Sequence, residues 1–132
     1  MTTTELRTQV RLGQEMIRRQ SQRRFSTFVK GMKADYDMQW FHRHICEKLD
    51  EFEEGGIKKL MILLPPQHGK SELASRLYPS YSLGRNPNKR IGMVTYNDTF
   101  AKKFNRQIQR YIDTDKYYRI FPNTRLNNSK LS

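Results

Sequence analysis

The stretch that most constrains this chain is residues 60–77, LMILLPPQHGKSELASRL. An apolar run stops at Pro65 and Pro66, and Gly-Lys-Ser follows just before a segment with helical apolar spacing. A chain that passes from a buried strand through a tight loop into a helix exposes the unpaired N–H groups of that helix. These groups and the positive end of the helix dipole attract anions, and phosphate in particular. The stretch therefore predicts a phosphate-binding turn.

Each residue type in this turn has a physical reason. Gly69 lets the backbone approach phosphate oxygens without a Cβ clash. Lys70 places a positive charge on the β- and γ-phosphates of a nucleotide, and the hydroxyl of Ser71 ligates Mg²⁺. The general pattern is G-x-x-x-x-G-K-[ST], and Leu64 stands where that pattern has its first glycine. The prediction therefore depends on the flanking strand and helix, and the alternative is an ordinary strand-to-helix turn with a surface lysine.

The segments around the turn predict an α/β fold. Residues 57–64 are apolar without alternation, as in a central strand that is covered on both faces. Residues 90–96 predict a second strand. The helix after Gly69 is expected to end before Pro79, and the connection is long enough to join parallel strands. We therefore expect a parallel βαβ unit.

Helices are predicted before and after this unit. Thr2-Thr3-Thr4-Glu5 fits a capping box that opens a long basic helix, broken near Ser21 or Ser26. Residues 1–36 would thus form a helical N-terminal arm, separate from a domain of residues 37–132. Residues 38–55 predict a helix that ends at its glycines, with this apolar face: Trp40, Phe41, His44, Ile45, Leu49 and Phe52.

The C-terminal third predicts one further helix and a loop. Asn97 or Asp98 is expected to cap a helix that runs to about Ile112. Residues 117–132 are rich in Asn and Ser and predict a loop.

The charge of the chain favours a polyanionic partner. The net charge is +12. Residues 1–36 hold eight basic and three acidic side chains, and residues 85–132 hold eleven basic and three acidic ones. Residues 37–84 are nearly neutral, with six basic and seven acidic side chains. Basic ends around a neutral middle suit nucleic acid, and the alternative is a solvated basic surface. The candidate nucleic-acid contacts are Arg18, Arg19, Arg23, Arg24, Lys102, Lys103, Arg106 and Arg110.

Few other functional classes fit the composition. The single cysteine, Cys46, excludes an intrachain disulfide and is expected to be a buried small hydrophobe. His42 and His44 lie two residues apart and point to different helix faces, so we expect no shared metal site. The N-terminus lacks the apolar core of a signal peptide, and no apolar run approaches about 20 residues, so a cytoplasmic protein without a membrane span is expected.

The run PPQHGKSEL resembles the Walker A segment of phage terminase large subunits, the ATP-driven motors that package DNA. In many of these proteins the first glycine is also replaced. Three segments resemble the family beside it, namely HRHICEKLDEFEEGGIKKLMILLPPQHGKSE, IGMVTYNDTFAKKFNRQIQRYI and YYRIFPNTRL. The resemblance covers about residues 37–132 and implies the first part of a RecA-like (ASCE) P-loop NTPase domain in the cytoplasm of an infected host.

The resemblance implies ATP and Mg²⁺ as cofactors. Lys70 would be the catalytic contact to the phosphates and Ser71 the Mg²⁺ ligand, in a nucleotide-binding loop of Pro66, Gln67, His68, Gly69, Lys70, Ser71 and Glu72. Gln67 stands where many members have arginine, so the loop would lack that charge. Residues that precede the strand often hold the adenine in this family. Here these would be Trp40, Phe41 and His42, although core packing is the favoured alternative for Trp40 and Phe41.

The implied function is ATP hydrolysis that drives double-stranded DNA into a procapsid. The family works as a self-associated ring on the portal protein, together with a small subunit. After Ser71 no acidic pair ends an apolar strand, and no acidic metal site of the family's C-terminal nuclease domain is recognisable. We therefore expect a truncated piece of a longer motor that does not turn over ATP alone. The alternatives are another helicase-like P-loop ATPase and a non-enzymatic module that binds nucleic acid or motor subunits.

Overall fold

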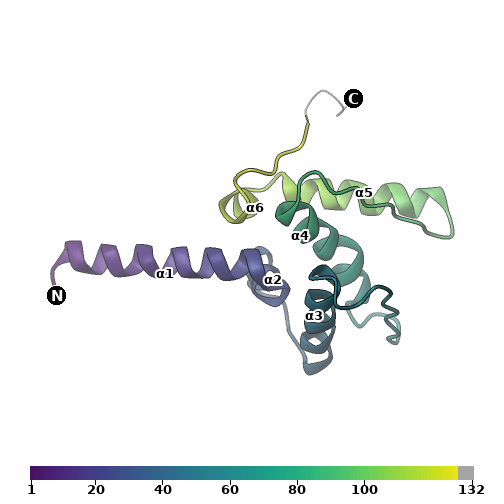
Figure 1. The fold of residues 1–132 in the computed structure, drawn as a ribbon, viewed down its shortest axis with the longest axis horizontal. Helices are drawn as coiled ribbons and strands as arrows, with labels where there is room; N and C mark the ends of the chain where they lie inside the picture. Colours follow the sequence, from purple (N-terminus) through teal and green to yellow (C-terminus); the bar gives the residue numbers. More distant parts are fainter. Residues whose placement is uncertain (128–132) are drawn as a thin grey trace.

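The described chain is built of helices, and its two longest connections precede η1 and α5 (Figure 1). The computed structural model describes residues 1–127. Its elements are α1 (Thr3–Arg23), α2 (Phe25–Met32), α3 (Trp40–Glu53), the π-helical η1 (Glu72–Leu77), α4 (Tyr78–Arg85), α5 (Asp98–Ile112) and α6 (Asp115–Ile120).

The core is built around aromatic side chains of α2, α4 and α6. Phe28 of α2 is fully buried, and its ring lies 5.3 Å from that of Tyr81, 5.8 Å from Phe121 and 6.1 Å from Tyr117. Phe25 adds a ring 6.3 Å from Phe28. Tilted and edge-to-face pairs at these distances are the arrangements that aromatic rings prefer. This cluster therefore holds together helices that lie far apart in the sequence.

The prediction of an α/β fold with a parallel βαβ unit is wrong. Residues 1–127 contain no strand and no sheet. Residues 59–65 and 90–95 are outside any helix, and alternating exposure over 60–64 and 93–96 indicates extended chain. Among the described residues the backbones of these two segments form no hydrogen bond with one another. An extended segment becomes a strand only when a neighbouring segment pairs with its N–H and C=O groups.

Burial of the first extended segment explains the error. Leu60, Ile62 and Leu64 pack against the helical core, whereas Met61 and Leu63 are each 82% exposed. Successive side chains of an extended segment point to opposite sides. Helices cover one side of this segment only, so its apolar run does not have the two covered faces of a central strand.

The N-terminal helices follow their local signals. Thr2 caps α1, and the Glu5 carboxylate accepts from the Thr2 N–H at 2.9 Å, which confirms the capping box. The helix breaks at Arg24, whose extended backbone separates α1 from α2. The first half of α1 extends away from the other helices in Figure 1. In contrast, α2 contributes Phe25, Phe28 and other buried residues to the core.

The middle and C-terminal helices agree in part with their predictions. The predicted helix of residues 38–55 is α3, and Gly55 ends it with a φ of +86°. Asn97 caps α5 through a 2.9 Å bond from the Phe100 N–H, as expected. The loop predicted for residues 117–132 is wrong at its start, because α6 covers Asp115–Ile120. Residues 128–132 lie outside the described part.

The helix after Gly69 does not end before Pro79. It continues as η1 and then as α4, in which Pro79 occupies the first turn. Proline inside an α-helix clashes with the carbonyl four residues earlier. The π-helical residues before Pro79 have a wider turn than an α-helix, which changes the position of the preceding carbonyls relative to the proline ring. The helix continues past Pro79 to Arg85.

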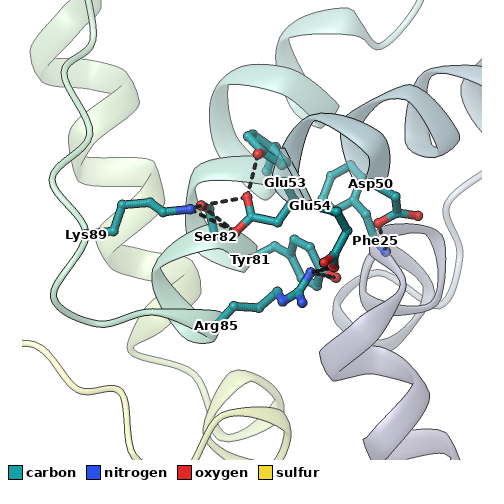
Figure 2. A network of polar contacts seen from close by, with 9 residues as sticks. Phe25, Asp50, Glu53, Glu54, Tyr81, Ser82, Arg85 and Lys89 are labelled. Atoms are coloured by element: carbon teal, nitrogen blue, oxygen red, sulfur yellow. Dashed lines mark hydrogen bonds and ion pairs between the residues drawn. The ribbon is translucent and has the colours of Figure 1, made fainter. Parts of the chain in front are cut away.

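A buried polar network joins α3 to α4 (Figure 2). The Glu53 carboxylate accepts from Tyr78 Oη at 2.5 Å, Ser82 Oγ at 2.9 Å and Lys89 Nζ at 2.9 Å. Arg85 pairs with Glu54 at 2.7 Å beside this network.

None of the helices in residues 1–127 combines the length and the apolar character that crossing a membrane would need.

Candidate phosphate-binding loop

The loop of residues 65–71 presents a run of free backbone donors. Gln67 has a φ of +65° and Gly69 a φ of +80°, and the helical run begins at Lys70. Within the described part of the chain, the backbone N–H groups of residues 67–71 donate no hydrogen bond to a backbone carbonyl or to a side chain. Left-handed residues before a helix start turn successive N–H groups toward one concavity, which suits an anion.

A histidine from α3 holds this loop in place. His42 Nδ1 accepts from the N–H of Gln39 at 3.0 Å, so the neutral ring carries its proton on Nε2. Nε2 lies 2.7 Å from the carbonyl oxygen of His68 and donates to it. His42 is buried and has a partner at both ring nitrogens. Its role in this structure is therefore to position the loop, and it has no free nitrogen for an adenine.

Gly69 is required by the space around it as well as by its φ. A Cβ at this position would lie 2.9 Å from Tyr36 Oη and 3.0 Å from His42 Nε2. The Tyr36 hydroxyl is buried and has no hydrogen-bond partner among the described residues. Burial raises the pKa of Tyr36 to about 12, together with the nearby Cys46 and Glu72. Any larger residue at position 69 would displace the side chains that support the loop.

We expect His42→Ala to release the loop while the helices remain. Loss of a buried bond to a backbone carbonyl costs about 1–3 kcal/mol. Cleavage by trypsin after Lys70 should therefore accelerate by roughly tenfold or more, because a released loop reaches the protease more often. His44→Ala is the matched control, because His44 is exposed on the same helix. Equal rates of cleavage after Lys70 in the two variants would show that His42 does not hold the loop.

Lys70 and Ser71 follow directly after this loop. Lys70 is half-buried, and it forms no ion pair or hydrogen bond with another described residue. Ser71 is exposed at the start of the helix. The structure thus leaves the ammonium group and the hydroxyl available beside the free N–H groups.

Glu72 is committed to the protein. Its carboxylate accepts from the Tyr111 hydroxyl and from Arg76 Nη1 at 2.6 Å, and Lys33 Nζ lies 3.3 Å away. Burial alone would raise the pKa of Glu72, but the bonds from Tyr111 and Arg76 and the nearby positive charges lower it. These contacts anchor the start of η1 to α5 and to the end of α2, so Glu72 stabilises the turn.

The aromatic residues at the start of α3 lie beside the loop. The ring of Phe41 is 5.8 Å from that of His68 and 5.7 Å from that of Trp40. Trp40 is 79% exposed, and His44 is exposed too, so the predicted apolar face is wrong at both positions. The face that is buried consists of His42, Ile45, Cys46 and Leu49. Cys46 is buried as expected, and burial raises the pKa of its thiol to about 12.

The candidate nucleic-acid residues lie on two separate helices. Arg18 and Arg19 both pair with Glu15, and Lys102 pairs with Asp98 at 2.7 Å. The others are exposed: Arg23, Arg24, Lys103, Arg106 and Arg110. In Figure 1, α1 and α5 extend away from the body in opposite directions, so the two sets do not form one continuous face.

Two residues of the site had no signal of this role in the sequence. Tyr36 lies in a segment that was predicted only to be a connector. His42 acts through the carbonyl of His68, which is 26 residues further along the chain, so no local pattern indicates this contact. The free N–H groups, Lys70 and Ser71 fit the phosphates and Mg²⁺ of a nucleotide, whereas Glu72 is already bonded within the protein. Comparisons with protein-family models, with curated proteins and with solved structures yield no match to this chain.

Proposed function

We propose that residues 65–71 bind the phosphates of ATP together with Mg²⁺. The observation that carries the proposal is the run of free N–H groups at residues 67–71, adjacent to a lysine that has no counter-ion among residues 1–127. Such groups supply the donors that phosphate oxygens need. Lys70 would neutralise phosphate charge, and Ser71 would contribute an oxygen ligand to the metal. Bound Mg²⁺ would neutralise phosphate charge and orient the phosphates.

The exposed Trp40, beside the half-buried Phe41, supports a nucleotide as the source of that phosphate. Trp40 and Phe41 lie next to the loop through the Phe41–His68 contact. An aromatic side chain with a free face can stack on a purine base. The base would then lie on the α3 side of the loop, with the phosphates toward Lys70.

The resemblance supplies the biological setting of the proposal. The chain would be the ATP-binding part of a viral terminase large subunit, which packages double-stranded DNA into procapsids. Its partners would be DNA, the portal protein, the small subunit and further copies in a ring. The exposed basic residues of α5 are suited to DNA phosphates.

Binding of a fluorescent ATP analogue in the presence of Mg²⁺ tests the proposal. Lys70→Ala should weaken binding by roughly 10- to 100-fold, because a charge-assisted bond is worth about 1.5–3 kcal/mol. Lys103→Ala is the control, since it removes the same charge from an exposed position on α5. Circular dichroism of both variants checks that the helices remain.

Two results would contradict the proposal. Equal binding by wild type and Lys70→Ala would show that the loop does not hold the phosphates. DNA binding that needs Lys103, Arg106 and Arg110, with no nucleotide binding at all, would favour the non-enzymatic module instead.

A further inference from the structure

A second surface lies on the opposite side of the molecule from α5, along α1. Three exposed apolar residues of α1 recur at the spacing of a helix–helix seam, namely Leu6, Val10 and Ile17, which are 53%, 52% and 58% exposed. Gly13 falls between them at the same spacing, and a Cβ there would meet nothing within 4 Å. The intervals of four, three and four residues place all four positions on one face, as in a coiled coil.

A line of polar and basic residues runs beside this apolar face. Arg7, Arg11, Gln14 and Arg18 each follow one residue after a member of the apolar set, so they form a parallel row on the helix. Arg7 and Arg11 form no ion pair with another described residue, while Arg18 pairs with Glu15.

The seam ends in a hollow between α1 and α6. This cavity of about 570 Å³ is bounded on the α1 side by Arg11, Gln14, Ile17 and Arg18, and on the α6 side by Lys116, Arg119 and Ile120. The bond from Gln22 Nε2 to the Ile120 carbonyl, at 2.6 Å, holds the two helices together below it. Four basic side chains of the described lining therefore surround an apolar floor, and Glu15 is its one acidic residue within residues 1–127.

We infer that this surface binds an acidic amphipathic helix of a partner protein. The apolar side of such a helix would cover Leu6, Val10 and Ile17, and its carboxylates would face Arg7, Arg11 and the basic wall of α6. The exposed part of α1 from residue 3 to residue 17 is about 21 Å long, which accommodates two heptads of the partner.

The charges and the shape favour this occupant over others. If a second copy of the chain paired through the same face of α1, the arginine rows of the two copies would lie close together and repel. The net charge of +12 on each copy adds to this repulsion. A nucleic-acid backbone would leave the apolar floor without a matching surface. A flat bilayer would not reach into a hollow that α6 walls on one side.

The test uses the full chain and a synthetic peptide of two to three heptads, with leucine at the seam positions and glutamate beside them. We expect this peptide to bind. Val10→Asp and Arg11→Glu should each weaken its binding by about tenfold or more. The matched controls are Val94→Asp and Arg106→Glu, which make the same changes at exposed positions far from α1 and should leave binding unchanged.

Three further probes give results that would overturn the inference. A peptide of the same composition in scrambled order should bind at least tenfold more weakly, and equal binding would show that charge alone acts. A DNA duplex, or vesicles that contain phosphatidylserine, could bind more tightly than the amphipathic peptide and lose that binding in Arg11→Glu. Either result would identify a different class of partner. Failure of the amphipathic peptide to bind to the wild-type chain would also refute it.

Discussion

Replacement of Phe28 by alanine should lower the free energy of unfolding by about 3–5 kcal/mol. Phe28 is fully buried, and its ring touches aromatic rings from α2, from α4 and from the α6 region. Loss of the ring removes apolar area from the core and leaves a cavity that its neighbours cannot fill without moving. Urea denaturation, followed by circular dichroism at neutral pH, measures the effect.

Phe100→Ala provides the matched control for Phe28. Phe100 lies in the first turn of α5 and is 37% exposed, so its replacement should cost at most about 1 kcal/mol. If Phe28→Ala lost no more stability than Phe100→Ala, the aromatic cluster would not be the centre of the core.

Replacement of Glu53 by alanine should cost roughly 3 kcal/mol. The Glu53 side chain is 5% exposed, and Tyr78, Ser82 and Lys89 all donate to it. Its removal leaves those donors without their acceptor and detaches α3 from α4. The matched control is Glu54→Ala, because Glu54 is 64% exposed, and its ion pair with Arg85 should contribute less than about 1 kcal/mol.

The contribution of Glu53 should also depend on pH. Burial alone would raise its pKa, but the bonds from Lys89, Tyr78 and Ser82 hold the pKa below the ordinary value of 4.5. The stabilisation is therefore complete above pH 4.5 and falls as the pH drops through the lowered pKa of the folded state. The stability difference between wild type and Glu53→Ala should shrink across that acid range. A difference that stays constant down to pH 2 would contradict the ion-pair account.

Local signals in the sequence were enough to predict several helices. The capping box at Thr2 and Glu5, the Asn97 cap and the glycine stop at Gly55 each act within a few residues. The helix start at Gly69-Lys70 was predicted on the same basis. These features do not depend on what packs against them, so the sequence was sufficient.

Features that depend on distant partners were not predictable in this way. The apolar run of residues 57–64 reads as a buried strand, but a strand needs a neighbouring segment to pair with it, and residues 1–127 supply none. Whether Trp40 or His42 of α3 is buried depends on the position of the loop at His68, which no helical periodicity specifies. The π turn before Pro79 was not predictable either, because a proline after a helical segment is ordinarily a sign that the helix ends.

The two extended segments have a consequence for how the protein behaves in solution. Met61, Leu63 and Val94 face water on segments whose backbones are unpaired within residues 1–127, which is the combination that promotes edge-to-edge aggregation. Charged residues and prolines at the ends of such segments act as gatekeepers, and here Lys58-Lys59 and Pro65-Pro66 bound the first of them. Repulsion between chains of net charge +12 adds to this protection and is screened by salt. The solubility of the chain is therefore tied to ionic strength, and low salt is the condition that keeps its molecules apart.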